Sequence, residues 1–145
     1  MASGPDALTA PIRAALEPLG VVRVAYFFGS RARGDARPDS DLDVGVAYAP
    51  DADDRAREQA RRAVVAALTD ALGAVGERAD VVDLEAADSA VAFRAIQTGT
   101  LLLARAPADR VRLEVRIARR YDDDAPKRAL FRRAALDAVA RLQVK

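Results

Sequence analysis

The chain has 145 residues, the length of one domain, and contains no cysteine and no histidine. Its 23 basic and 22 acidic residues give a net charge of +1, which argues against a strong field for nucleic acid over the whole molecule. These counts exclude disulfides, thiolate nucleophiles, zinc sites built from cysteine or histidine, and a serine–histidine–aspartate triad. Any chemistry must use carboxylates, hydroxyls, basic side chains, backbone groups and metal ions.

The chain shows no sign of a membrane span or a secretory signal. No segment approaches the ~20 consecutive apolar residues that cross a bilayer. Residues 1–20 lack a basic region followed by an apolar one. We expect a cytoplasmic protein without membrane association, in which residues 1–145 form a single domain.

The first half of the chain predicts two helices and two strands. A helix begins near Pro11, because proline is tolerated in a first turn, and ends at Gly20. The β-branched and aromatic run 21–28 predicts a strand buried on most of both faces. A loop that can hold one helical turn follows, and 41–48 predicts a second strand. Residues 53–72 place small and apolar side chains at helical spacing, and Gly73 ends this helix.

The second half continues the alternation. Residues 79–84 predict a third strand, 88–98 a helix, 100–104 a short fourth strand and 107–121 another helix. This alternation predicts an α/β or α+β domain with a short mixed sheet of about four strands flanked by helices.

A last helix is predicted over 126–142. We expect its apolar stripe to face the core and the acidic run 122–124 to lie at its N-terminus, where acids complement the helix dipole. The alternative is that this helix, or the basic residues before it, forms a partner-docking surface. The stripe consists of Leu130, Ala134, Ala138 and Leu142, and the basic residues are Arg112, Arg116, Arg119 and Arg120.

The segment between the first two predicted strands carries the features of a phosphate site. Gly29 and Ser30 directly follow a buried strand, where glycine allows close approach of a ligand. A serine hydroxyl and free N–H groups at a helix start form a cradle for phosphate. Arg31 and Arg33 add cations that suit phosphate oxygens.

Two carboxylates stand close to this segment. Asp41 and Asp43 lie two residues apart in a predicted strand, so their side chains share one face, roughly 6–7 Å apart along the strand. Two like charges so placed repel unless a cation lies between them. Mg²⁺ prefers such hard oxygen ligands together with substrate phosphates. The combination predicts metal-assisted phosphoryl or nucleotidyl transfer.

The run Gly29-Ser30-Arg31-Ala32-Arg33-Gly34, followed by Ser40-Asp41-Leu42-Asp43, resembles the signature of the DNA polymerase β-like nucleotidyltransferases. It is most similar to their minimal, single-domain MNT branch, and the resemblance covers nearly the whole chain. It implies the polymerase β-like fold, ATP or another nucleotide as donor, and two Mg²⁺ ions held by Asp41 and Asp43. Gly29 and Ser30 would hold the β- and γ-phosphates, and Ser40 is included in the nucleotide site.

The resemblance also implies a third carboxylate on a neighbouring strand. Asp80 and Asp83 are the candidates, and they face opposite sides of one strand because they lie three residues apart. Asp80 fits the family pattern better, so we predict Asp80 as metal ligand or general base. Asp83 then has a structural role near the following turn.

Residues 90–104, and Tyr121-Asp122 followed by a basic helix, are similar to the corresponding segments of the antitoxin members of this branch, which pair with HEPN-domain RNase toxins. This similarity implies that AMP passes to a hydroxyl of the toxin, expected to be a tyrosine, within a hetero-oligomer that does not bind nucleic acid directly. Two alternatives stay open. The chain could neutralise the toxin by stable binding alone, or it could modify a small molecule.

Overall fold

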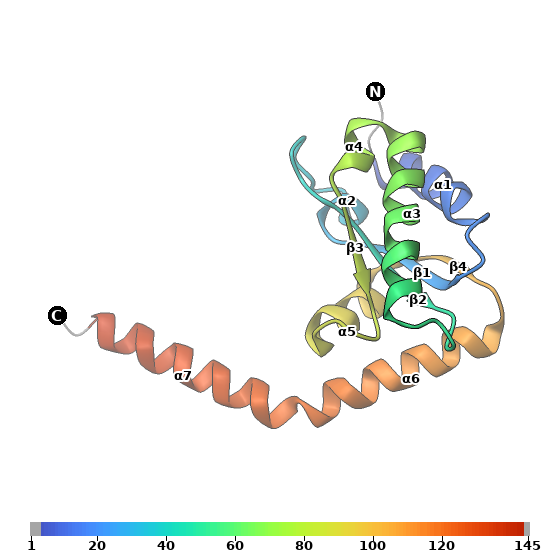
Figure 1. Ribbon diagram of the computed structural model, residues 1–145. Helices are drawn as coiled ribbons and strands as arrows, with labels where there is room; N and C mark the ends of the chain where they lie inside the picture. The colour runs from blue at the N-terminus through green and yellow to red at the C-terminus, as the bar shows by residue number, and fades with distance from the viewer. Residues whose placement is uncertain (1–3, 144–145) are drawn as a thin grey trace.

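Four short apolar segments form one sheet in the computed structural model, which describes residues 4–143 (Figure 1). Strand β1 pairs antiparallel with β2 and β4, and β2 pairs parallel with β3, which gives the order β3-β2-β1-β4. The bounds are β1 Val22–Phe28, β2 Leu42–Tyr48, β3 Ala79–Asp83 and β4 Thr100–Ala104. The mixed four-stranded sheet with flanking helices confirms the predicted fold class.

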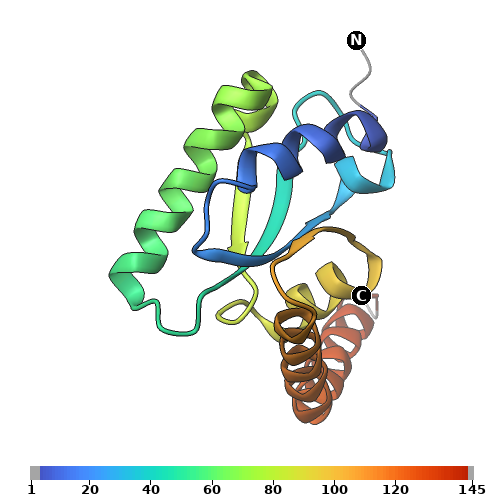
Figure 2. The same cartoon turned by 90° about the vertical axis from the view of Figure 1, so that its right-hand side faces the viewer.

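One face of the sheet packs against α1 (Pro5–Leu16) and α3 (Asp54–Leu72), and the short helix α4 (Ala74–Glu77) follows α3 (Figure 2). Helix α1 begins earlier than predicted and includes Pro11 in its interior. The helix tolerates the hydrogen bond lost at Pro11 because its stripe of Leu8, Ile12 and Leu16 is buried against the sheet.

The other face packs against α5 (Ser89–Thr98) and α6 (Pro107–Asp123). Side chains that point to this face largely alternate with those that point to α1 and α3, and irregularities in the pairing of β1 with β2 and β4 interrupt the alternation. The buried residues on this side are Val24, Tyr26, Phe28, Ala47, Leu84, Ala92, Ala95, Leu113 and Ile117. Since Phe28 pairs with Asp43, the α5–α6 side is also the face toward which Asp43 points.

Helix α7 (Ala125–Gln143) projects away from the rest of the molecule (Figure 1). The prediction that its stripe faces the core is wrong, because none of its residues is buried; Leu130 is 67% exposed and Leu142 78%. Helical periodicity identifies an apolar side but not what covers it. The acidic run is also placed differently, because Asp122 and Asp123 lie in the last turn of α6 and only Asp124 directly precedes α7.

The predicted loop after β1 contains one helical turn, α2 (Ser30–Arg33), before the chain returns to β2. No helix among residues 4–143 combines the length and apolar character that crossing a bilayer requires.

Candidate active site

The turn between β1 and α2 is built around Gly29. Its backbone angles, φ 81° and ψ −165°, lie in a region that is essentially restricted to glycine. A Cβ added to Gly29 would lie 2.1 Å from Oδ2 of Asp43. The missing side chain therefore lets the backbone at the start of α2 approach the Asp43 carboxylate directly.

The parallel pairing of β2 and β3 brings two of the predicted carboxylates together. Asp43 lies opposite Asp80 in the register, and paired residues of neighbouring strands point to the same face. Asp41 precedes β2 and is exposed, two residues before Asp43, which is half-buried. The turn at Gly29 borders the same carboxylate from the β1 side. Asp41, Asp43 and Asp80 thus gather at one end of the sheet, on the face that carries α5.

The electrostatics of Asp43 reflect this gathering. Burial raises the pKa of its carboxyl group above the ordinary value, and the nearby carboxylates of Asp80 and Asp41 raise it further. The guanidinium of Arg33 acts in the opposite direction on the same pKa. Asp43 is therefore a carboxylate whose negative charge lacks full compensation from the protein, which is the condition that favours binding of a cation.

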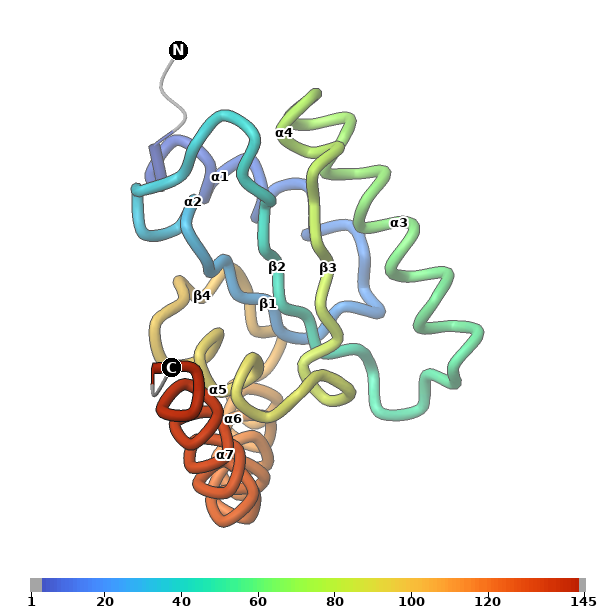
Figure 3. Tube along the Cα trace, turned by 90° about the vertical axis from the view of Figure 1, so that its left-hand side faces the viewer, coloured from blue at the N-terminus to red at the C-terminus, as the bar shows by residue number. Residues whose placement is uncertain are grey.

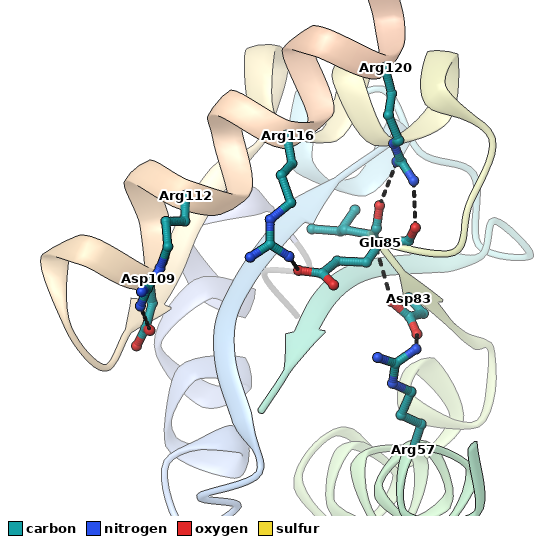
Figure 4. Close-up of polar contacts among 8 residues, drawn as sticks. Arg57, Asp83, Glu85, Asp109, Arg112, Arg116 and Arg120 are labelled. Atoms are coloured by element: carbon teal, nitrogen blue, oxygen red, sulfur yellow. Dashed lines mark hydrogen bonds and ion pairs between the residues drawn. The ribbon is translucent and has the colours of Figure 1, made fainter. Parts of the chain in front are cut away.

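Asp83 lies on the opposite face of β3 and belongs to a different set of contacts (Figure 4). Its carboxylate lies 3.9 Å from Nη1 of Arg57 on α3, and it accepts a hydrogen bond of 3.0 Å from the backbone N–H of Glu85. These contacts close the turn after β3. The geometry therefore separates the two candidates for the third carboxylate, with Asp80 beside Asp43 and Asp83 turned toward α3.

The structure gives Arg31 a position that sequence reasoning missed. Arg31 is buried, its Nε donates to the carbonyl oxygen of Ser40 and its Nη2 to that of Pro38, both at 3.1 Å. The guanidinium thereby ties α2 to the segment that leads into Asp41. By contrast, Arg33 is exposed and makes, within residues 4–143, only a long contact of 3.4 Å with Asp35, so its guanidinium is accessible to a ligand.

Ser40 is also engaged in the loop. Its Oγ accepts a hydrogen bond of 2.8 Å from the backbone N–H of Arg37. A further anchor that the sequence did not reveal is Arg78, whose carbonyl accepts from the N–H of Leu42 and whose Nη1 donates to the carbonyl of Asp39. No local pattern signals this role, because it depends on the neighbouring position of β3.

The donor set fits Mg²⁺ in part. Among residues 4–143, no three acidic side chains converge into a ready-made metal cluster. Mg²⁺ in proteins is commonly held by one or two carboxylates together with substrate phosphates and water, and it does not need an all-protein cage. The undercompensated Asp43, with Asp41 and Asp80 close by and the Gly29 turn beside them, supplies hard oxygen donors next to a place for phosphate.

Comparison with known proteins identifies the family of the chain. The family model described as "Polymerase beta, Nucleotidyltransferase" matches residues 11–108, more than half of the chain. The chain therefore belongs to this nucleotidyltransferase family. No curated protein matches it.

Three similar solved structures extend the comparison to nearly the whole chain. A toxin–antitoxin with AMP-PNP has a TM-score of 0.67 and 23% identity over 88% of this chain and 98% of that one. The toxin–antitoxin MntA–HepT has a TM-score of 0.59 and 22% identity over 88% and 96%. The tri-AMPylated Shewanella oneidensis HEPN toxin in complex with MNT antitoxin has a TM-score of 0.60 and 21% identity over 90% and 98%. At these identities the likeness shows a shared fold.

Proposed function

We propose that this chain is an MNT-type antitoxin, an adenylyltransferase that uses Mg²⁺ and transfers AMP from ATP to a hydroxyl of a HEPN-domain toxin. The observation that carries the proposal is the close approach of the Gly29 turn to Asp43, with Asp80 opposite. Family membership supports the reaction class, and the toxin–antitoxin complexes among the similar structures, one with AMP-PNP and one with an AMPylated toxin, support the donor and the partner.

The nucleotide would bind at the start of α2. The Gly29 turn leaves room for phosphate, and the hydroxyl of Ser30 and the first free N–H groups of α2 can donate to phosphate oxygens. Arg33 is exposed near Asp43 and adds a cation. Arg31 and Ser40 act as positioning residues, because they hold the loop that presents Asp41 and Asp43.

Asp41 and Asp43, with Asp80, would hold two Mg²⁺ ions. When bound, Mg²⁺ neutralises phosphate charge and makes an acceptor hydroxyl more acidic. The acceptor oxygen forms a bond to the α-phosphorus of ATP as the bond from that phosphorus to the oxygen of the β-phosphate breaks. Pyrophosphate leaves with the electron pair, and the hydroxyl proton passes to the carboxylate of Asp80 where Asp80 serves as general base, or to solvent where it serves as metal ligand. We expect the acceptor hydroxyl to belong to a tyrosine.

Further properties follow from this proposal. The toxin pairing implies a hetero-oligomer in the cytoplasm, with the chain acting as one nucleotidyltransferase domain followed by its C-terminal helices. We expect no direct contact with nucleic acid, because the near-neutral net charge gives no general attraction.

The test is transfer of label to the acceptor protein. The chain is incubated with ATP labelled at the α-phosphate, MgCl₂ and the product of the neighbouring gene, which the proposal expects to be a HEPN-domain protein. Label on that protein, lost with Asp41→Asn and with Asp43→Asn, is the expected result. Label transfer that persists in both variants, or none from the wild-type chain with any nucleoside triphosphate, contradicts the proposal.

The exposed helix α7 supports a second candidate, in which the chain neutralises the toxin by stable binding without catalysis. This candidate predicts that Asp41→Ala still protects cells that express the toxin. Catalysis predicts that protection is lost while the complex still forms, so one survival assay with a pull-down separates the two functions.

A further inference from the structure

Helix α7 carries apolar side chains that nothing within residues 4–143 covers. Phe131 is 69% exposed, and Leu130, Leu136, Val139 and Leu142 are each at least half exposed. Five large apolar side chains exposed on one helix exceed the single, scattered ones of an ordinary protein surface, and such a concentration indicates an interaction site.

Part of this apolar surface forms a regular seam. Phe131, Ala135, Ala138 and Leu142 follow each other at spacings of four, three and four residues, which places them along one line of the helix. Two alanines in the seam allow another helix to approach closely. Lys127 lies on the same line one turn before Phe131, Arg132 and Arg141 lie on either side of the seam, and the helix has only one acidic residue, Asp137. The complementary surface is a helix with an apolar stripe and acidic flanks.

The N-terminal end of α7 is held in place by contacts with α5 and α6. The ring of Tyr121 on α6 stacks on Phe93 of α5, with centroids 4.1 Å apart and planes at 15°. The guanidinium of Arg128 on α7 lies over the other side of that ring, 3.5 Å from its centroid. Ser89 Oγ donates to Asp124 Oδ2 at 2.5 Å. These contacts fix the direction in which α7 leaves, which reduces the entropy lost when a partner binds.

The direction of α7 can be compared with the direction in which the candidate active-site carboxylates point. Helices α5 and α6 cover the sheet face toward which Asp43 and Asp80 point, and α7 continues from α6. In Figure 3, which looks toward the C-terminal end of α7, this helix projects to the viewer below α5. Helix α7 thus leaves from the sheet face toward which Asp43 and Asp80 point, while its N-terminal end contacts the residues that follow the opposite end of β3.

We propose that α7 is a docking arm for the acceptor protein, whose acidic-flanked apolar helix binds the seam of Phe131, Ala135, Ala138 and Leu142. Docking there brings the acceptor hydroxyl to the catalytic face. The proposal rests on the proposed function for the identity of the acceptor. A second copy of this chain suits the seam less well, because its own basic flanks would repel.

The test compares two exposed sites on one helix. Phe131→Asp combined with Leu142→Asp places charge in the seam, and Leu136→Asp is the matched control, since Leu136 is 63% exposed and lies off the seam. None of these residues is buried, so both variants keep the fold, which circular dichroism and thermal melting check. Affinity for the acceptor protein, expected to be the HEPN-domain product of the neighbouring gene, and the initial rate of label transfer are measured for each.

The seam variant is expected to weaken acceptor binding and raise the KM for the acceptor by about tenfold or more, with the KM for ATP unchanged. Leu136→Asp stays close to wild type. The docking proposal is overturned if the seam variant binds the acceptor as tightly as the wild-type chain does. It is also overturned if the wild-type chain does not bind the acceptor at all.

Two further outcomes separate the docking arm from the reaction. Seam-dependent binding without any transfer of label refutes the AMP transfer and leaves the docking arm standing. The chain could also self-associate through the seam. If the seam variant abolishes self-association but keeps its affinity for the acceptor, the seam binds a second copy of the chain and the proposal is overturned.

Discussion

Substitution of Gly29 by alanine tests the geometry on which the site depends. The backbone angles of Gly29 cost an alanine about 1–3 kcal/mol of stability. The added Cβ would lie 2.1 Å from Oδ2 of Asp43, whereas real contacts of this kind stay above 3.0 Å. The carboxylate must therefore withdraw by about 1 Å, and a displacement of that size in a catalytic group lowers the rate by about 100-fold.

Gly34 provides the control, because it also has a positive φ, 86°, and ends the same helical turn. The nearest atom to a Cβ at Gly34 is Cγ of Pro5 at 3.5 Å, an ordinary contact. Gly34→Ala therefore costs about 1–2 kcal/mol of backbone strain without touching Asp43. Initial rates of label transfer are measured below the melting temperature of each variant. Equal rates for Gly29→Ala and Gly34→Ala would refute the reasoning.

Three further predictions follow from the contacts. Asp43→Asn removes label transfer, yet its melting temperature without metal stays at or above that of wild type, because the half-buried charge faces Asp80 and Asp41. Asp80→Asn lowers the transfer rate by at least about 100-fold, whereas Asp83→Asn leaves it within a few-fold and costs about 1 kcal/mol or less in urea unfolding. Arg31→Ala destabilises the protein by about 2–3 kcal/mol in the same assay, since two buried carbonyl contacts are lost.

The sheet was largely predictable from the sequence, because each strand is a short run with apolar residues between turn residues, β-branched or aromatic in β1 and β2 and leucine-rich in β4. Strands β1 and β2 lie within the predicted 21–28 and 41–48. The start of α1 was not predicted, since Pro11 was interpreted as a first-turn residue. The burial of Leu8 keeps that helix continuous from Pro5.

The site was predictable only as far as local spacing extends. The sequence placed Asp41 and Asp43 on one strand, next to the Gly29 turn. The pairing of Asp43 with Asp80 depends on which strands are neighbours, and the burial of Arg31 depends on how the loop folds back over α2. Neither property is encoded in a short segment.

The surroundings of α6 and α7 show the same limit. Arg116 donates to Glu85 Oε1 at 2.9 Å, and Arg120 donates to the carbonyl of Leu84 at 3.0 Å, so part of the predicted basic surface is engaged within the molecule (Figure 4). The exposed apolar side chains lie on α7. The periodicity of this helix predicted that its apolar stripe would face the core. Periodicity alone does not distinguish a helix that packs on the core of its own chain from one whose apolar side chains are exposed.

The central claim is that the chain modifies its toxin covalently, and intact-mass spectrometry of the HEPN-domain protein tests it most directly. After incubation with the chain, ATP and MgCl₂, the account predicts a mass increase by one or more whole AMP units that map to tyrosine and are absent with Asp43→Asn. A toxin of unchanged mass that is nevertheless neutralised in a stable complex would contradict the account.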